Sequence, residues 1–248
     1  MNHVELTDAK ALISRSEKHY ADYRGTMSGL TSITKKQDQE DKIWVYTLIF
    51  NGQLLIDGKP FLSDAAINLV SAMDHIVSAM ARQNGLVDSP RIHCPFHTTD
   101  TEFQNMLRGV TRHIGGANAA ILDQHYQANE QDVTHVDALK KLANAGKHWK
   151  LAVPSINPQT IGMNQENGPQ KFINIPESIF VNNTKNEFEF YREKEPMWDE
   201  SIYLITKEEI VGLTDHHPHS PDTIFSCSTR YVKELITKIE KAGGIRPT

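Results

Sequence analysis

Residues 64–82 predict an amphipathic helix whose polar face carries short side chains. Six polar residues recur at intervals of three and four, which places them within about 80° of one helical face. These six residues, called the first polar stripe, are Asp64, Asn68, Ser71, His75, Ser78 and Arg82. The stretch contains no Lys or Glu, the long charged residues that usually cover a helix face in bulk water. We therefore expect this face to lie against another element of the fold.

A second predicted helix, residues 132–150, has a polar stripe that also ends in histidine. The second polar stripe comprises Asp137, Lys141, Asn144 and His148, at spacings of four, three and four. If the two helices face each other, the polar groups converge in one of two ways. In the first, His75 and His148 act as general acid and base while Lys147 binds an anion. In the second, the groups form a hydrogen-bonded seam that fixes the register of the two helices.

The patterns elsewhere predict an α+β fold: a helical bundle with an early β-hairpin, then a small antiparallel β lobe and a C-terminal helix. A helix is expected up to residue 23, followed by a polar loop over 31–42. Residues 43–50 and 53–56, joined by Asn51-Gly52, predict the hairpin. Further helices are expected from about 62 to 85, from 99 to 115 with Thr99 and Glu102 as a capping box, and over 117–128.

The composition changes after residue 153. Residues 154–170 are rich in Pro, Asn, Gln and Gly and predict a long connection. Short β-like runs follow at 171–175, 179–181, 187–191, 202–206 and 223–227, and residues 228–242 predict the closing helix. We therefore expect two domains, a helical bundle with hairpin at 1–153 and a small β-rich lobe with closing helix at 171–248, or else one compact domain.

Charge and cysteine usage exclude several classes of protein. The net charge of −5 argues against a protein that coats nucleic acid through its overall field. Only two cysteines occur, far apart, so we expect no disulfide framework and a reducing cytoplasm. No apolar run is long enough to span a membrane. No histidine, cysteine or glycine spacing indicates a metal or a cofactor, and none is expected.

Two segments resemble a family of uncharacterised bacterial proteins. Its members read Asp-x3-Asn-Leu-Arg-Ser-Ala-x-Asp-His and later carry a Lys-His motif. The matching residues here are Asp64, Asn68, Leu69, Ser71, Ala72, Asp74 and His75, then Leu139, Leu142, Asn144, Lys147 and His148. With the family's Arg before Ser71, the helix is similar to the motif of HEPN-type ribonucleases. This chain has Val70 at that position, which removes the cation expected to hold a scissile phosphate.

Two functions remain open. The leading interpretation is a binding or interaction protein whose polar seam, including Asp64, Asn68, Ser71, Asp74 and Asn144, is structural or holds a small anionic ligand. The alternative is a HEPN-like, metal-independent ribonuclease or nucleotide-processing enzyme using His75, His148 and Lys147. Val70 and the acidic net charge favour the first. The resemblance allows RNA as a partner. It also allows a homodimer, because HEPN-type sites are commonly completed across a helical dimer.

Overall fold

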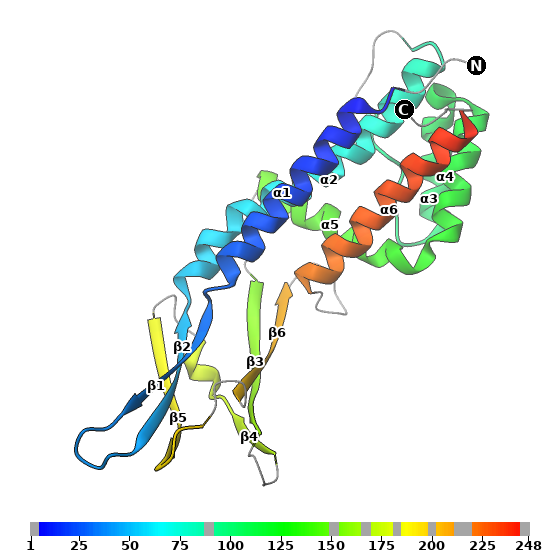
Figure 1. Ribbon diagram of the computed structural model, residues 1–248. Helices are drawn as coiled ribbons and strands as arrows, with labels where there is room; N and C mark the ends of the chain where they lie inside the picture. The colour runs from blue at the N-terminus through cyan, green and yellow to red at the C-terminus, as the bar shows by residue number, and fades with distance from the viewer. Residues whose placement is uncertain are drawn as a thin grey trace. The chain divides into compact units, whose positions relative to one another are not determined.

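The computed structural model describes residues 5–86, 92–148, 154–164, 170–180, 185–197, 202–210 and 220–243 (Figure 1). The helices are α1 (Thr7–Met27), α2 (Gln53–Gln83), α3 (Asp100–Ile114), α4 (Gly116–Ala128), α5 (Glu130–His148) and α6 (Pro221–Ala242). The strands are β1 (Thr31–Gln37), β2 (Trp44–Asn51), β3 (Pro154–Met163), β4 (Lys171–Asn174), β5 (Lys185–Glu193) and β6 (Ile202–Ile210), with a short 3-10 helix, η1 (Glu177–Ile179). The predicted α+β class, with an early hairpin and a closing helix, is confirmed.

The chain forms two compact units that interleave along the sequence. Unit 1 comprises residues 1–21, 61–152 and 213–248, and unit 2 comprises residues 22–60 and 153–212. Both boundaries in the first third of the chain fall inside a helix, after Ala21 in α1 and after Pro60 in α2. The predicted division at 153–171 was a single cut along the sequence, whereas each unit draws on separate segments.

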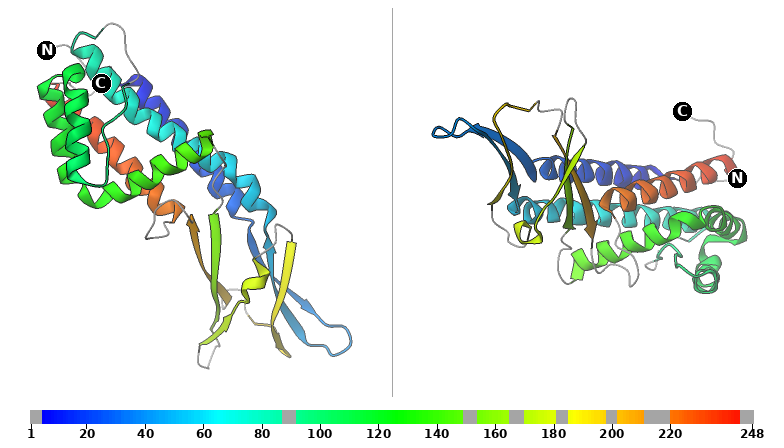
Figure 2. Two further views of the ribbon diagram at one scale, coloured as in Figure 1. Left: turned by 180° about the vertical axis from the view of Figure 1, so that it is seen from behind. Right: turned by 90° about the horizontal axis from the view of Figure 1, so that it is seen from below.

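Unit 1 is helical, and its core is built from the apolar faces of α2, α5 and α6. Leu69, Ile76 and Met80 of α2 are completely buried, as is Leu139 of α5. Helix α5 packs extensively along α6, and α4 contacts both (Figure 2). Ser16 of α1 donates a hydrogen bond to the carbonyl oxygen of Ala65 in α2, at 2.7 Å. A long apolar face on each helix therefore holds this unit together.

Unit 2 contains two three-stranded antiparallel sheets, with strand orders β1-β2-β5 and β4-β3-β6. Strand β2 alternates, with Tyr46, Leu48 and Phe50 buried and the residues between them half-buried. Tyr46 and Leu48 form one core with Ile161 and Met163 of β3. Because side chains alternate between the two faces of a strand, one face of each sheet supplies this core.

The hairpin lies earlier in the chain than predicted. The partner of β2 is β1, with Thr34 opposite Thr47, and the residues after Gly52 start helix α2. The expected loop over 31–42 is therefore wrong for residues 31–37. Their Thr and Ile content suits an edge strand, whose outer side can be polar. Gln53, Leu54 and Leu55 are good helix formers, and Leu55 is buried within α2.

Three later predictions are also corrected. The expected connection over 154–170 contains β3, in which Pro154 is the first residue and Pro158 lies at an irregularity in the pairing with β6, two positions where a strand tolerates proline. The run 223–227 is helical, because Pro221 at the first turn starts α6 before it. The described part of the run 179–181 belongs to η1 and the residue after it.

No helix among the described residues combines the length and the apolar character that crossing a bilayer requires.

Candidate functional site

The first polar stripe lies along the outer side of α2. Asp64, His75 and Arg82 are exposed, and Asn68, Ser71 and Ser78 are half-buried. The Asn68 amide donates to the backbone oxygen of Asp64 at 2.6 Å, so its bond stays within the helix. His75 lies 3.9 Å from the carboxylate of Asp8 in α1, with nearly half of its side chain exposed. The stripe is therefore a partly solvated face whose histidine has a carboxylate beside it.

The second polar stripe follows the surface of α5. Asp137 and Lys141 form an ion pair of 3.0 Å between successive turns, and Asn144 is exposed. The side chains of Lys147 and His148 lie outside the described residues. Between the described residues of the two stripes, no hydrogen bond or ion pair is present.

Asp74 takes part in a site that the sequence patterns did not predict. Its Oδ1 accepts a hydrogen bond from the backbone N–H of Cys94 at 2.8 Å, and its Oδ2 bonds to Nδ1 of His93 at 2.9 Å. The carboxylate is 29% exposed and the His93 side chain is 70% exposed. Asp74 therefore attaches the segment 92–97 to α2. In neutral His93, the bond to Asp74 places the ring proton on Nδ1 and leaves Nε2 as an acceptor.

Lys140 of α5 lies beside the same segment. Its Nζ is 5.3 Å from the ring centroid of Phe96, a cation–π distance. Burial raises the pKa of the Cys94 thiol to about 12, and the Asp74 carboxylate adds to this effect while the Lys140 ammonium opposes it. A carboxylate-oriented imidazole and an ammonium group thus flank one short stretch of chain. We call His93, Asp74 and Lys140 the segment site.

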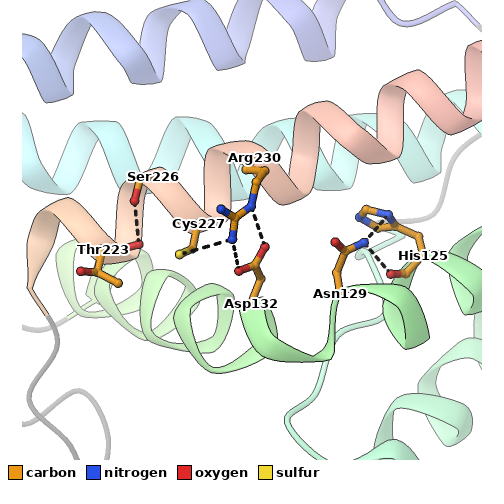
Figure 3. A network of polar contacts seen from close by, with 7 residues as sticks. All are labelled: His125, Asn129, Asp132, Thr223, Ser226, Cys227 and Arg230. Atoms are coloured by element: carbon orange, nitrogen blue, oxygen red, sulfur yellow. Dashed lines mark hydrogen bonds and ion pairs between the residues drawn. The ribbon is translucent and has the colours of Figure 1, made fainter.

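A polar network joins α5 to α6 (Figure 3). Arg230 donates two hydrogen bonds to Asp132, from Nε at 3.1 Å and from Nη2 at 2.5 Å. Asp132 is 2% exposed, whereas half of the Arg230 side chain is exposed. The thiol of Cys227 lies 3.8 Å from the same guanidinium. The two-pronged geometry fixes both side chains, so this pair is a structural connection between the two helices.

His125 occupies the inner end of the network. The Asn129 side-chain amide lies 3.1 Å from Nδ1 of His125 and donates to the backbone oxygen of His125 at 2.9 Å. Because the amide is the donor, the neutral ring carries its proton on Nε2, a buried atom with no hydrogen bond of normal length. Burial, assisted by the charge of Lys238, lowers the pKa of His125 to about 4. The imidazole is therefore neutral near pH 7 and behaves as a core residue.

Tyr231 connects this buried histidine to the segment site. Its ring lies 4.2 Å from the His125 ring and 6.0 Å from the Phe96 ring, measured between centroids. Burial raises the pKa of its hydroxyl, so the side chain stays neutral. The aromatic contacts position Phe96, and with it the backbone that carries His93.

The sequence patterns selected Asp74 but missed its partners. His93 is 19 residues away and lies in an extended segment, where no helical or strand period links it to Asp74. Asp132 lies in the first turn of α5 and resembles an ordinary acidic residue at that position. For Lys140 the sequence did carry a signal. This residue follows the buried Leu139 and precedes Asn144 by four residues, which places Lys140 on the same helix face as Asn144. Within the described residues, no group of three His, Cys, Asp or Glu side chains could hold a metal ion.

Comparison with protein-family models, with curated proteins and with solved structures finds no match for this chain.

Proposed function

We propose that this chain is a binding protein, that its polar stripes are mainly structural, and that a small anionic ligand binds at the segment site. The observation that carries the proposal is the double contact of Asp74 with His93 and with the Cys94 backbone. That contact holds an imidazole in one orientation while most of the ring stays exposed to solvent.

The contacts of the stripes support a structural role. Asn68 bonds to its own helix, and Asp137 pairs with Lys141 one turn away. Asp74, which lies on α2 outside the stripe, anchors a neighbouring segment. An anion at His75 would also meet the carboxylate of Asp8, 3.9 Å from the ring. At 3.9 Å this contact is too long for a hydrogen bond, so it does not orient the His75 ring as Asp74 orients His93.

The charges of the segment site suit an anion better. Lys140 supplies a positive charge, and the Asp74 carboxylate already accepts two hydrogen bonds. Imidazolium and ammonium groups form charge-assisted hydrogen bonds to phosphate or carboxylate oxygens.

The test is a titration of the full chain with inorganic phosphate, followed by NMR of the backbone amides. We expect the chemical-shift changes to concentrate on residues 92–97. The affinity for phosphate should fall at least about tenfold in Lys140→Met and in His93→Gln, the loss typical of one charge-assisted hydrogen bond. Lys141→Met is the matched control, because Lys141 pairs with Asp137 instead. Two results would contradict the proposal. One is no chemical-shift change at about 50 mM phosphate, roughly the weakest useful affinity; the other is an equal loss of affinity in Lys141→Met.

One observation favours the enzymatic alternative as a second candidate. An imidazole hydrogen-bonded through Nδ1 to a carboxylate is the usual arrangement of a general base, and His93 has that arrangement. The HEPN-like motif on α2, in contrast, has the buried Val70 in place of its arginine. Metal-independent RNA cleavage in EDTA that is lost in His93→Gln and kept in His75→Gln would establish this candidate. Absence of turnover in the parent protein would leave binding as the function.

We further propose a cytoplasmic location, because Cys94 and Cys227 are both free thiols and a reducing compartment keeps them so. A homodimer is part of the enzymatic alternative only, since HEPN-type sites commonly need two chains. A monomer measured by light scattering would count against that alternative and would leave the binding proposal intact.

A further inference from the structure

The β4-β3-β6 sheet of unit 2 (Figure 1) has exposed apolar side chains on one face. Phe172 of β4 is 57% exposed and Ile205 of β6 is 39% exposed. Phe172 lies opposite Gly162 and Ile205 lies opposite Thr160, two residues of β3 that share a face. Ile161, between them in the chain, is completely buried in the core of unit 2. The exposed side chains therefore lie on the side of the sheet that faces away from this core.

We call this side the outer sheet face. Two rows of paired residues form it, and they comprise Thr160, Gly162, Phe172, Asn174, Tyr203 and Ile205.

Tyr203 supplies a second aromatic surface in the row of Phe172. It pairs with Gly162 from β6, and the far end of its ring lies over that glycine, where a Cβ atom would be 2.6 Å from the tyrosine hydroxyl oxygen. The side-chain amide of Gln170 donates to this hydroxyl, which holds the ring across β3. Phe172 pairs with the same glycine from β4. Two aromatic side chains therefore flank the one position in this row that has no side chain to separate them.

The polar groups on the outer sheet face carry no charge. Asn174 is exposed and Thr160 is half-buried, and both lie in the row of Ile205. None of the six residues in the two described rows is charged. The adjacent Lys171 is directed to the other face, where its Nζ lies 5.3 Å from the ring centroid of Tyr191 in β5. Aromatic surface beside amide and hydroxyl groups suits a neutral polar ligand.

We propose that the outer sheet face binds a neutral oligosaccharide through glucose-like pyranose rings. In a β-linked glucose unit the ring substituents are equatorial, so both faces of the ring present C–H bonds. The hydrogens of these bonds are weakly positive and pack against the negative faces of the Phe172 and Tyr203 rings. The amide of Asn174 and the hydroxyl of Thr160 provide donors and acceptors for the sugar hydroxyls. This site uses residues of unit 2 only and does not depend on the segment site, so the two proposals fail separately.

Two other occupants of an aromatic face fit these observations less well. Single-stranded nucleic acid stacks its bases on aromatic rings but also needs cations along its backbone, and the two described rows contain no Lys or Arg. A second copy of the chain would need a larger surface, since a stable interface buries roughly 800 Å² on each partner. Two rows across three strands cover on the order of 200 Å². A neutral sugar needs neither cations nor so large a surface.

The test is an NMR titration of the full chain with cellotetraose, a neutral β-linked glucan. We expect the chemical-shift changes to concentrate on β3, β4 and β6. The affinity should fall at least about fivefold in Phe172→Ala, the loss typical of one aromatic contact. Phe172→Trp keeps an aromatic surface and should bind at least as tightly as the parent. Because Phe172 is mostly exposed, neither change should lower the melting temperature by more than about 2 °C.

Met106→Ala is the matched control. Met106 is also an exposed apolar side chain, at 36%, but it belongs to α3 in unit 1, so this change should leave the affinity for cellotetraose unaltered. No chemical-shift change at about 20 mM cellotetraose, or an equal loss of affinity in Met106→Ala, overturns the proposal. Two further results would also overturn it and would identify another occupant. Changes in the same strands with oligothymidylate alone would indicate nucleic acid, and a dimer that Phe172→Ala dissociates, without glucan binding, would indicate self-association.

Discussion

At the scale of single residues, burial separates the histidines of unit 1 into different chemical classes. His125 is 1% exposed and sits against the Tyr231 ring, whereas His93 and His75 are exposed. Burial disfavours the charged form of an imidazole, because its hydration is lost. Residue type alone therefore could not distinguish a histidine that binds or reacts from one that packs.

His125 predicts that stability falls at acidic pH. Its pKa is about 4 in the folded protein against 6.5 for an ordinary histidine, so the unfolded chain takes up the proton first. The contribution of neutral His125 to the free energy of unfolding is fully present above pH 6.5. It is lost as the pH falls towards 4, by on the order of 3 kcal/mol in total. Urea unfolding at pH 7.5 and at pH 5 should show this loss, and His125→Gln should reduce it. His75→Gln is the control and should behave like the parent.

At the scale of elements, contacts between a helix and an irregular segment define the segment site. Helix α2 supplies Asp74, the extended stretch supplies His93 and Cys94, and α5 supplies Lys140. The helices themselves were predictable from their apolar periods. The course of residues 92–97 depends on a hydrogen bond to α2 and on packing of Phe96 against Tyr231, and neither contact has a local sequence signal.

Asp74 should keep Cys94 unreactive by fixing the backbone of the segment. In Asp74→Ala the Cys94 N–H loses its acceptor, and local opening should speed alkylation of this buried thiol at least about tenfold, since modification needs an exposed thiolate. Site-resolved mass spectrometry after iodoacetamide treatment measures the rate, with the half-buried Cys227 as internal reference. Asp64→Ala removes an exposed carboxylate from the same helix. An equal effect in that variant would show that the bond to Cys94 is not responsible.

In the β4-β3-β6 sheet, Gly162 is required by the side chain opposite it. Tyr203 pairs with Gly162 across β3 and β6, and a Cβ atom at residue 162 would overlap the tyrosine ring. Gly162→Ala should therefore destabilise the protein by about 1–3 kcal/mol through overpacking. In a Tyr203→Ala background the same change should cost much less, which a double-mutant cycle of urea denaturation can measure. Equal costs in both backgrounds would contradict this account of the glycine.

At the scale of the whole molecule, two units with separate cores share two helices. Unit 1 has its core among α2, α5 and α6, and unit 2 has its core between the two sheets. Helices α1 and α2 contribute residues to both units. No single cut in the sequence therefore separates them, and the change of composition near residue 153 was an incomplete guide to the units.

Equivalent truncations in the two cores should act locally. Leu48 of β2 and Leu139 of α5 are both 0% exposed, and each change to Ala should cost about 2–5 kcal/mol. Hydrogen exchange should speed first in β2 and β5 for Leu48→Ala, and in α5 and α6 for Leu139→Ala. Uniform acceleration across both units in either variant would instead mean that they unfold as one cooperative body.

The sequence by itself determined the α+β class and most helices, because apolar period, capping residues and turn residues act over short distances. It misplaced the hairpin partner and the start of α6, where several local structures suit the same residues. Only the tertiary structure decided that Asp74 joins His93 and that His125 is buried and neutral. These features arise from contacts between residues distant in sequence, whose pairing depends on how the helices pack.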